Sequence, residues 1–349
     1  MVSSKAGVTI RLNPAGKCPA GNFAVRFRGS ISRFIFLPVR RGFFQFRDGS
    51  VIFPIHFVQR PGMRPTAKID VVIPAFNRKR LLAESVRSVL GQSYRDFNCL
   101  VVDDGSTDGT GEMLETFGSA VTCLRQANRG PAAARNRGIR AGRAPLVAFL
   151  DSDDRWDPEK LAVQTAAMER EPDCLISHTQ EVWYRRGELL PQKKRHRKPS
   201  GYIFARSLAM CVVSMSTVMV RRELFDRVGC FDEDLPCCED YDFWLRASLE
   251  TRFLLVDRPL TFKEGGRPDQ VSAVFREGMD RFRIRSLVNL IRNGRLSTER
   301  RSLALAELRR KCGIYGRGAR KRGREEEGRY YLALPDSLAR EREVAIGVV

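Results

Sequence analysis

Alternating strands and helices from residue 69 onward constrain the fold of this chain more than any other feature of its sequence. Four short apolar runs are typical of buried strands: residues 69–74 (IDVVIP), 97–102 (FNCLVV), 120–124 (AVTCL) and 146–150 (LVAFL). Two segments between them, residues 80–92 and 131–141, carry apolar side chains at helical spacing. Strands that alternate with helices in this rhythm form parallel sheets with right-handed crossovers, so we expect an α/β domain.

Polar residues follow three of these strands. Asn77 follows the first, residues 103–108 (DDGSTD) follow the second, and residues 151–154 (DSDD) follow the fourth. Parallel strands end at the same edge of a sheet, and α/β proteins bind their ligands at that edge. The three loops should therefore form one crevice, which indicates a ligand site more strongly than any one loop does.

The DSDD segment is a candidate metal site. Asp151, Asp153 and Asp154 offer hard oxygen ligands that suit Mg²⁺ or Mn²⁺ bridging a diphosphate. A metal there would neutralise the charge on a departing nucleoside diphosphate. The alternative is a helix cap, in which Asp154 or Asp157 caps a helix that begins near Pro158.

Two further features of the crevice have competing interpretations. Asp104 could accept hydrogen bonds from a base or a sugar, and Gly105 would let a ring approach the backbone, but DDGSTD could equally be an ordinary strand-to-helix turn. On a helix that faces the crevice, Arg135 could pair with a phosphate or a base. The alternative for Arg135 is a place on the surface.

A third acidic segment, residues 237–246 (CCEDYDFWLR), lies in the less regular second half of the chain. A carboxylate here is a candidate general base that would deprotonate a hydroxyl group. Glu239 and Asp240 could instead stabilise the N-terminus of the helix that follows. Trp244 is either a core residue or a platform for a sugar.

The basic residues are unevenly distributed. The chain has 61 Lys and Arg against 41 Asp and Glu, a formal net charge of +20. Residues 1–66 hold eleven of these cations and one carboxylate, Asp48, so half of the net charge lies there. This surplus of positive charge favours an anionic partner such as a phosphorylated donor or a membrane. The alternative is that the charges only keep the protein in solution. We expect residues 1–66 to be a basic extension that is either disordered or mis-assigned, because Met63 would serve as a start.

Cysteine usage and hydropathy indicate the compartment. The nine cysteines form no C-x-x-C pair, and their odd number favours a reducing environment. We find no apolar run of roughly 18 residues that would span a bilayer, and no signal-peptide pattern. We expect a cytoplasmic protein that can rest on the inner face of a membrane.

Together the motifs resemble the family 2 glycosyltransferases. The matching segments, in order, are residues 71–77 (VVIPAFN), 101–108 (VVDDGSTD), 134–138 (ARNRG), 149–154 (FLDSDD), 231–233 (FDE) and 239–240 (ED). The resemblance implies a GT-A fold, which is Rossmann-like with a mainly parallel sheet flanked by helices. It also implies a division into a glycosyltransferase domain over residues 67–275, with a nucleotide-binding half (67–155) and an acceptor half (156–275), and a helical C-terminal appendage over 276–349.

The resemblance assigns roles to residues of this chain. It implies an inverting enzyme that moves a sugar from a nucleotide donor, UDP-sugar favoured, to a hydroxyl of a glycan or lipid-linked acceptor. The implied nucleotide-binding residues are Pro74, Ala75, Phe76, Asn77, Asp104, Gly105, Arg135 and Asp151. Asp151 and Asp153 would form the D-x-D pair, with Asp153 and Asp154 on a Mn²⁺ or Mg²⁺ ion. Asp240 would be the general base, with Glu239 and Trp244 on the acceptor side.

The chain departs from the family in two ways. Relatives often supply a late histidine as a metal ligand, but no histidine follows Asp240. The Q-x-x-R-W motif of polymerising synthases is missing, so a single addition is favoured, as in bacterial surface-polysaccharide synthesis. One alternative is a sugar-phosphate nucleotidyltransferase, which needs a glycine-rich loop where residues 74–78 read PAFNR. The other, a non-catalytic basic protein that binds nucleic acid, is disfavoured because the acidic motifs are intact.

Overall fold

The computed structural model describes residues 67–193 and 196–346, and before them only four short strands. These are β1 (Asn22–Phe27), β2 (Ser30–Ile35), β3 (Phe43–Phe44) and β4 (Phe53–Pro54). β1 pairs with β2 and β3 with β4, both antiparallel, inside a unit that covers Met1–Gln59. The rest of the expected basic extension, including Met63, lies outside the described residues. Arg60–Val349 form the second unit.

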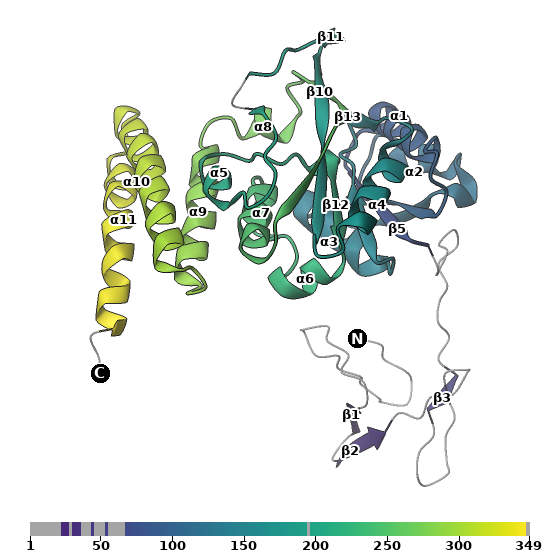
Figure 1. The fold of residues 1–349 in the computed structure, drawn as a ribbon, viewed down its shortest axis with the longest axis horizontal. Helices are drawn as coiled ribbons and strands as arrows, with labels where there is room; N and C mark the ends of the chain where they lie inside the picture. Colours follow the sequence, from purple (N-terminus) through teal and green to yellow (C-terminus); the bar gives the residue numbers. More distant parts are fainter. Residues whose placement is uncertain are drawn as a thin grey trace. The chain divides into compact units, whose positions relative to one another are not determined.

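One nine-stranded sheet organises the second unit (Figure 1). Its strands are β5 (Ile69–Ala75), β6 (Phe97–Asp103), β7 (Thr122–Arg125), β8 (Leu146–Phe149), β9 (Asp154–Trp156), β10 (Ile176–Arg185), β11 (Glu188–Leu189), β12 (Val218–Arg221) and β13 (Phe253–Gly265). They are ordered β7, β6, β5, β8, β12, β10, β13, β9, and β11 pairs with β10. β5, β6, β7 and β8 are parallel to their neighbours in this group, as the strand–helix rhythm predicts, whereas β12 and β9 run antiparallel to theirs.

Helices cover both faces of the sheet. They are α1 (Lys79–Leu90), α2 (Thr110–Glu115), α3 (Gly130–Ala141), α4 (Lys160–Arg170), α5 (Phe204–Ala209), α6 (Glu223–Val228), α7 (Glu239–Glu250), α8 (Val271–Val274), α9 (Met279–Arg292), α10 (Thr298–Lys321) and α11 (Glu325–Ile346). Successive side chains of β5 enter different cores. Val71 and Ile73 pack with α1, α2 and α4, whereas Val72 packs with α3, α6 and α7. This is why β5 reads as a continuous apolar run.

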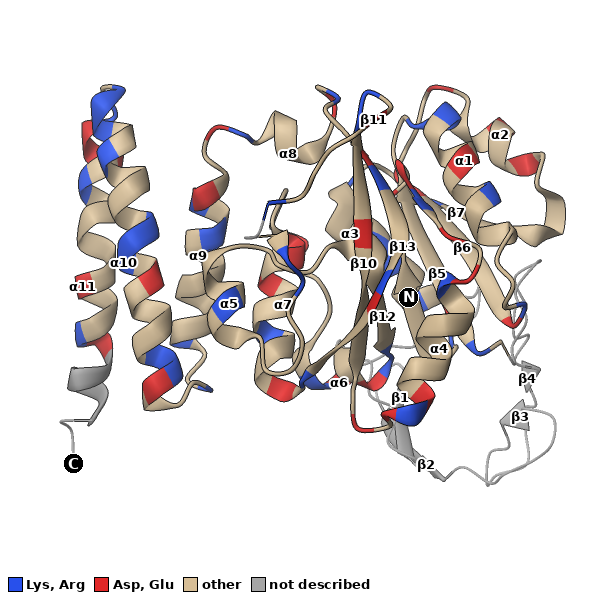
Figure 2. Ribbon diagram, turned by 45° about the horizontal axis from the view of Figure 1, so that its top comes forward, with Lys and Arg blue, Asp and Glu red and all other residues tan. Residues whose placement is uncertain are grey.

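The last three helices, α9, α10 and α11, form the C-terminal appendage. Their apolar side chains pack in a separate core, to which α5 and α7 also contribute. Glycines let α10 and α11 pack closely. A Cβ atom on Gly316 would lie 2.8 Å from Leu332 Cγ and 3.0 Å from the Gly328 carbonyl oxygen. Figure 2 shows acidic and basic residues along both helices. No helix in the described part of the chain is long and apolar enough to cross a membrane.

Candidate active site

The loops after β5 and β6 lie together, as predicted. The Asn77 amide donates a hydrogen bond to Ser106 Oγ at 2.9 Å, and the Thr107 amide donates to Asn77 Oδ1 at 2.8 Å. Asn77 adopts a left-handed backbone conformation with φ 49°, which asparagine tolerates better than most residues. Pro74 and Ala75 complete β5, and the Phe76 side chain is 45% exposed beside them.

Asp104 holds the loop that leads into α3. Its Oδ1 accepts hydrogen bonds from Gln126 Nε2 at 2.7 Å and from the Arg129 amide at 3.0 Å, and its Oδ2 accepts from the Gly130 amide at 2.8 Å. Gly105 has φ 85°, and the group that approaches it is the backbone of Asn128, 2.9 Å from where a Cβ would lie. The structure thus gives both residues a role in fixing this turn, and their contact with a base stays a prediction.

Arg135 lies between two carboxylates rather than on the surface or in an open crevice. It is 5% exposed, with Nη2 2.8 Å from Asp151 Oδ1 and Nη1 2.5 Å from Glu239 Oε1. Burial opposes the charged guanidinium, but the two carboxylates together keep the pKa of Arg135 above its usual value. The surface alternative for Arg135 is therefore wrong, and its pairing with a phosphate or a base stays a prediction. Arg135 joins the DSDD segment after β8 to the ED pair on α7.

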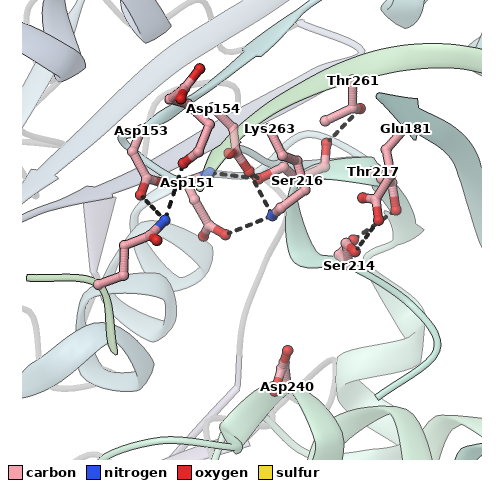
Figure 3. Close-up of polar contacts among 12 residues, drawn as sticks. Asp151, Asp153, Asp154, Glu181, Ser214, Ser216, Thr217, Asp240, Thr261 and Lys263 are labelled. Atoms are coloured by element: carbon pink, nitrogen blue, oxygen red, sulfur yellow. Dashed lines mark hydrogen bonds and ion pairs between the residues drawn. The ribbon is translucent and has the colours of Figure 1, made fainter. Parts of the chain in front are cut away.

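Asp154 belongs to the scaffold of the site (Figure 3). It is 2% exposed, and its Oδ2 accepts hydrogen bonds from Ser216 Oγ at 2.6 Å and from Lys263 Nζ at 2.7 Å. The pKa of Asp154 is raised to about 7, chiefly because the side chain is buried. The charge of Lys263 opposes this rise, and the charges of Asp153 and Asp151 add to it. The helix-cap alternative does not apply to Asp154, which begins β9; the Glu159 amide donates instead to Asp157 Oδ1.

Asp153 contacts the segment that follows β13. Its Oδ2 pairs with Arg267 and accepts a hydrogen bond from Gln270 Nε2 at 3.3 Å. Between them, the Asp269 carbonyl accepts a hydrogen bond from Arg78 Nη2 at 2.7 Å. Residues 264–270 therefore connect the loop after β5 to the DSDD segment across the mouth of the strand ends.

These contacts test whether a divalent metal fits. The described residues hold no cluster of three His, Cys, Asp or Glu side chains arranged for a metal. Asp154 is a poor ligand, because Ser216 and Lys263 already occupy its Oδ2 atom, and we correct that expectation. Mg²⁺ commonly binds through one or two carboxylates plus substrate phosphates and water. Asp153, 17% exposed, and Asp151, 27% exposed, fit that smaller requirement.

Asp240 lies in the first turn of α7, apart from the three carboxylates in Figure 3. Its Oδ2 accepts a hydrogen bond from Cys211 Sγ at 3.2 Å, and its Oδ1 accepts from the Tyr241 amide at 2.6 Å. Burial, followed by the charge of Asp240, raises the pKa of the Cys211 thiol well above its usual value, so the thiol stays protonated and donates. Cys238, which precedes the helix, has a left-handed backbone with φ 64°, a conformation that strains a non-glycine residue. Glu239 and Asp240 also place negative charge at the helix N-terminus, as the alternative interpretation held.

Trp244 leaves the set of acceptor-side candidates. Its side chain is 1% exposed and packs edge-on against Phe243 and Phe253 in the core. Lys198, at the end of the charged segment 193–198, is also buried. Lys198 Nζ is buried 2.8 Å from Glu181 Oε1. Glu181 also accepts a hydrogen bond from Ser214 Oγ at 2.9 Å.

Sequence reasoning missed several residues that complete the site. Lys263, Arg267, Ser216 and Cys211 reach the acidic segments from distant parts of the chain, and none lies in a recognisable motif. Lys263 lies in β13, where Asp257, Arg258 and Glu264 are also charged, so the sequence gives no signal that singles it out. The partners of Asp154 and Asp240 therefore required the structure.

Comparison with known proteins relates this arrangement to a family. The model described as Glycosyl transferase family 2 matches residues 70–229, which include the DSDD segment but end before Asp240. An uncharacterized glycosyltransferase of Rickettsia conorii is 32% identical over 196 residues, which cover 56% of this chain and 32% of that protein. The Escherichia coli UDP-Glc:alpha-D-GlcNAc-diphosphoundecaprenol beta-1,3-glucosyltransferase WfaP is 28% identical over 186 residues, 51% of this chain and 68% of that protein.

The fold has a counterpart among solved structures. The crystal structure of S. aureus TarS 1-349 in complex with UDP-GlcNAc superimposes with a TM-score of 0.62 at 21% identity, covering 77% of this chain and 79% of that one. This likeness confirms the expected GT-A-like arrangement. The chain spans only about a third of the length of the Rickettsia relative.

Proposed function

The chain belongs to the family 2 glycosyl transferases, and from that premise we propose that it moves a sugar from a nucleoside diphosphate to a hydroxyl group with inversion. One observation carries the proposal. Arg135 binds both Asp151, after β8, and Glu239, the neighbour of Asp240 on α7. The D-x-D pair, which suits a diphosphate, is thereby linked through Arg135 to the helix that carries Asp240, our candidate base.

On the donor side, Asp151 and Asp153 would face the ribose and the diphosphate, beside Asn77 and Asp104 at the neighbouring strand ends. A divalent metal, when bound by Asp153 and the phosphate oxygens, supplies positive charge for the leaving diphosphate. Asp153 would exchange its contacts with Arg267 and Gln270 when the donor enters. Both partners belong to one short segment, so one movement would free the carboxylate.

On the acceptor side, Asp240 would take the proton of the attacking hydroxyl. The oxygen would then form a bond to the anomeric carbon on the face opposite the diphosphate, and the bond to the diphosphate would break. The Cys211 thiol and the Tyr241 amide hold the Asp240 carboxylate in place through its two oxygens. Because the transfer is direct, no nucleophilic side chain is needed to carry the sugar.

The activity for which WfaP is named favours a UDP-sugar as the donor and a lipid-linked diphosphate as the acceptor. A role in building bacterial surface polysaccharide from the cytoplasmic side follows from that proposal. The identity of the sugar and of the linkage would be set by side chains beyond the motifs.

The test is thermal unfolding with UDP, GDP or dTDP, each with and without Mn²⁺, on the full chain. A ligand that binds only the native state stabilises it by about 2.7 kcal/mol at a concentration a hundred times its Kd. We expect a metal-dependent rise in melting temperature for UDP, lost in Asp153→Ala and kept in Asp173→Ala, an exposed carboxylate outside the site. No rise with any nucleotide would contradict the proposed donor site.

A further inference from the structure

Large apolar side chains are exposed at the edge of the molecule beside the site. Leu189 is 64% exposed and Leu190 39%, at the tip of the β10–β11 hairpin. Val271 is 43% exposed and Val274 64%, both on α8. Apolar groups that gather on a protein surface mark sites of interaction.

The hairpin and the segment before α8 are joined. Arg185 pairs in register with Gly265 at the end of β10 and β13, and the Gly187 amide donates a hydrogen bond to Glu264 Oε1 at 3.2 Å. The same segment carries Arg267, which binds Asp153. The exposed apolar edge therefore adjoins the mouth of the candidate active site, and β11 and α8 lie toward the same end of the sheet in Figure 1.

The hairpin end of this edge is also basic, whereas around α8 Arg276 is exposed together with Asp269 and Glu277. Arg185, Arg186, Lys193 and Arg197 are exposed, against the single exposed carboxylate Glu188 in residues 184–193 and 196–198. None of the four cations forms an ion pair with a carboxylate among the residues that the structure describes. In Figure 2 basic residues colour the turn beside β11. Exposed leucines flanked by unpaired cations match an interface of acyl chains and anionic headgroups.

We propose that the β10–β11 hairpin and α8 dock this chain on an anionic lipid bilayer. Leu189 and Leu190 enter the boundary of the acyl chains, while Arg185 and Arg186 remain at the phosphate headgroups. Nucleic acid would engage the cations but leave the aliphatic leucines without an apolar partner. The inference extends the proposed function, since docking here would bring a lipid-linked acceptor to the mouth of the site, but the docking itself requires no transfer activity.

The test is sedimentation of the full chain with vesicles of phosphatidylglycerol and phosphatidylethanolamine, compared with vesicles of phosphatidylcholine. The full chain is used because residues 1–66 are basic and must be the same in every variant. We expect Leu189→Ser/Leu190→Ser to weaken binding to the anionic vesicles about tenfold or more. The matched control is Leu303→Ser/Ile314→Ser on α10, where the side chains are 40% and 49% exposed, and it should bind as the wild type does. Equal binding by the hairpin variant and the wild type would overturn the proposal.

A second readout reports on the hairpin itself. Trp156 and Trp244 are 3% and 1% exposed and Trp183 on β10 is half-buried, so the new indole of Leu189→Trp is followed as the difference from the wild-type spectrum. Its emission should shift to shorter wavelength with anionic vesicles and stay unchanged with phosphatidylcholine. An unshifted emission would overturn the proposal. Two other results for the serine variant would also overturn it: weaker binding to duplex DNA with unchanged vesicle binding, or weaker self-association with unchanged vesicle binding. Nucleotide-induced thermal stabilisation tests the enzyme separately, so the two proposals can fail independently.

Discussion

Lys263 Nζ lies 2.7 Å from Asp154 Oδ2, and the two residues are directly opposite each other in the antiparallel pair of β9 and β13. This pair fastens the end of the DSDD segment to the last strand of the sheet. Ser216, in the short turn Met215–Thr217 before β12, donates to the same oxygen. Asp154 is therefore fixed by β13 and by the turn before β12, whereas the side chains of Asp151 and Asp153 are more exposed, at 27% and 17%.

The buried Asp154 predicts how stability depends on pH. Its pKa of about 7 in the folded protein exceeds the ordinary value of 3.8, so the folded state binds the proton more tightly than the unfolded state. Its contribution to stability is then fully present below about pH 4 and is lost as pH rises through about 7. We expect the free energy of unfolding to fall over this range, with a slope from this group of at most about 1.4 kcal/mol per pH unit.

Urea unfolding at a series of pH values checks this prediction. In Asp154→Asn the slope between pH 4 and 7 should become shallower, whereas the exposed control Asp173→Asn should leave it unchanged. Identical slopes in wild type and Asp154→Asn would show that another group titrates in this window.

Removal of Arg135 should destabilise the protein strongly. Arg135→Ala leaves Asp151 and Glu239 without their cation, and breaking a buried ion pair costs about 3–5 kcal/mol. Arg135→Lys keeps the charge but loses the two-pronged geometry, so we expect a smaller loss of stability. Arg137→Ala on the same helix is the control, because Arg137 has no ion pair within the described part of the chain. Urea unfolding measures all three, and an equal effect of both alanine changes would contradict the prediction.

Asp240→Asn should slow sugar transfer by about a hundredfold to ten-thousandfold, the usual contribution of general base catalysis. Nucleotide-induced thermal stabilisation should persist, because Asp240 lies apart from the DSDD segment. The rate of release of the nucleoside diphosphate measures the effect, with Asp234→Asn, whose side chain is 81% exposed, as control. A variant that retains the full rate would exclude Asp240 as the base.

Gly138 should not tolerate a side chain. A Cβ atom there would collide with Val72 Cγ1, where α3 packs on β5. Overpacking of this kind costs about 1–3 kcal/mol, so Gly138→Ala should lower the urea midpoint. In the control Gly111→Ala, on α2, the nearest atom is Arg125 Nη1 at 3.8 Å, and the midpoint should not fall. A midpoint unchanged by Gly138→Ala would mean that α3 can shift away from the sheet.

Local sequence predicted the fold of residues 69–150 well. The runs that became β5, β6 and β8 are apolar throughout because side chains on both faces are covered, and helical spacing marks α1 and α3 between them. The helical C-terminal appendage was also predicted, but no local pattern contains the close approach of α10 to α11 at Gly316 and Gly328.

The sequence by itself determined that Asn77, Asp104 and Asp151 would lie at one edge of the sheet, because the carboxyl ends of parallel strands lie at the same edge. It could not determine which acidic residues remain free to act. Only the tertiary structure decided that Lys263 forms an ion pair with Asp154, that Arg135 joins Asp151 to Glu239, and that Trp244 is buried in the core. Ion pairing and burial depend on distances between side chains far apart in the chain, and those distances exist only after folding.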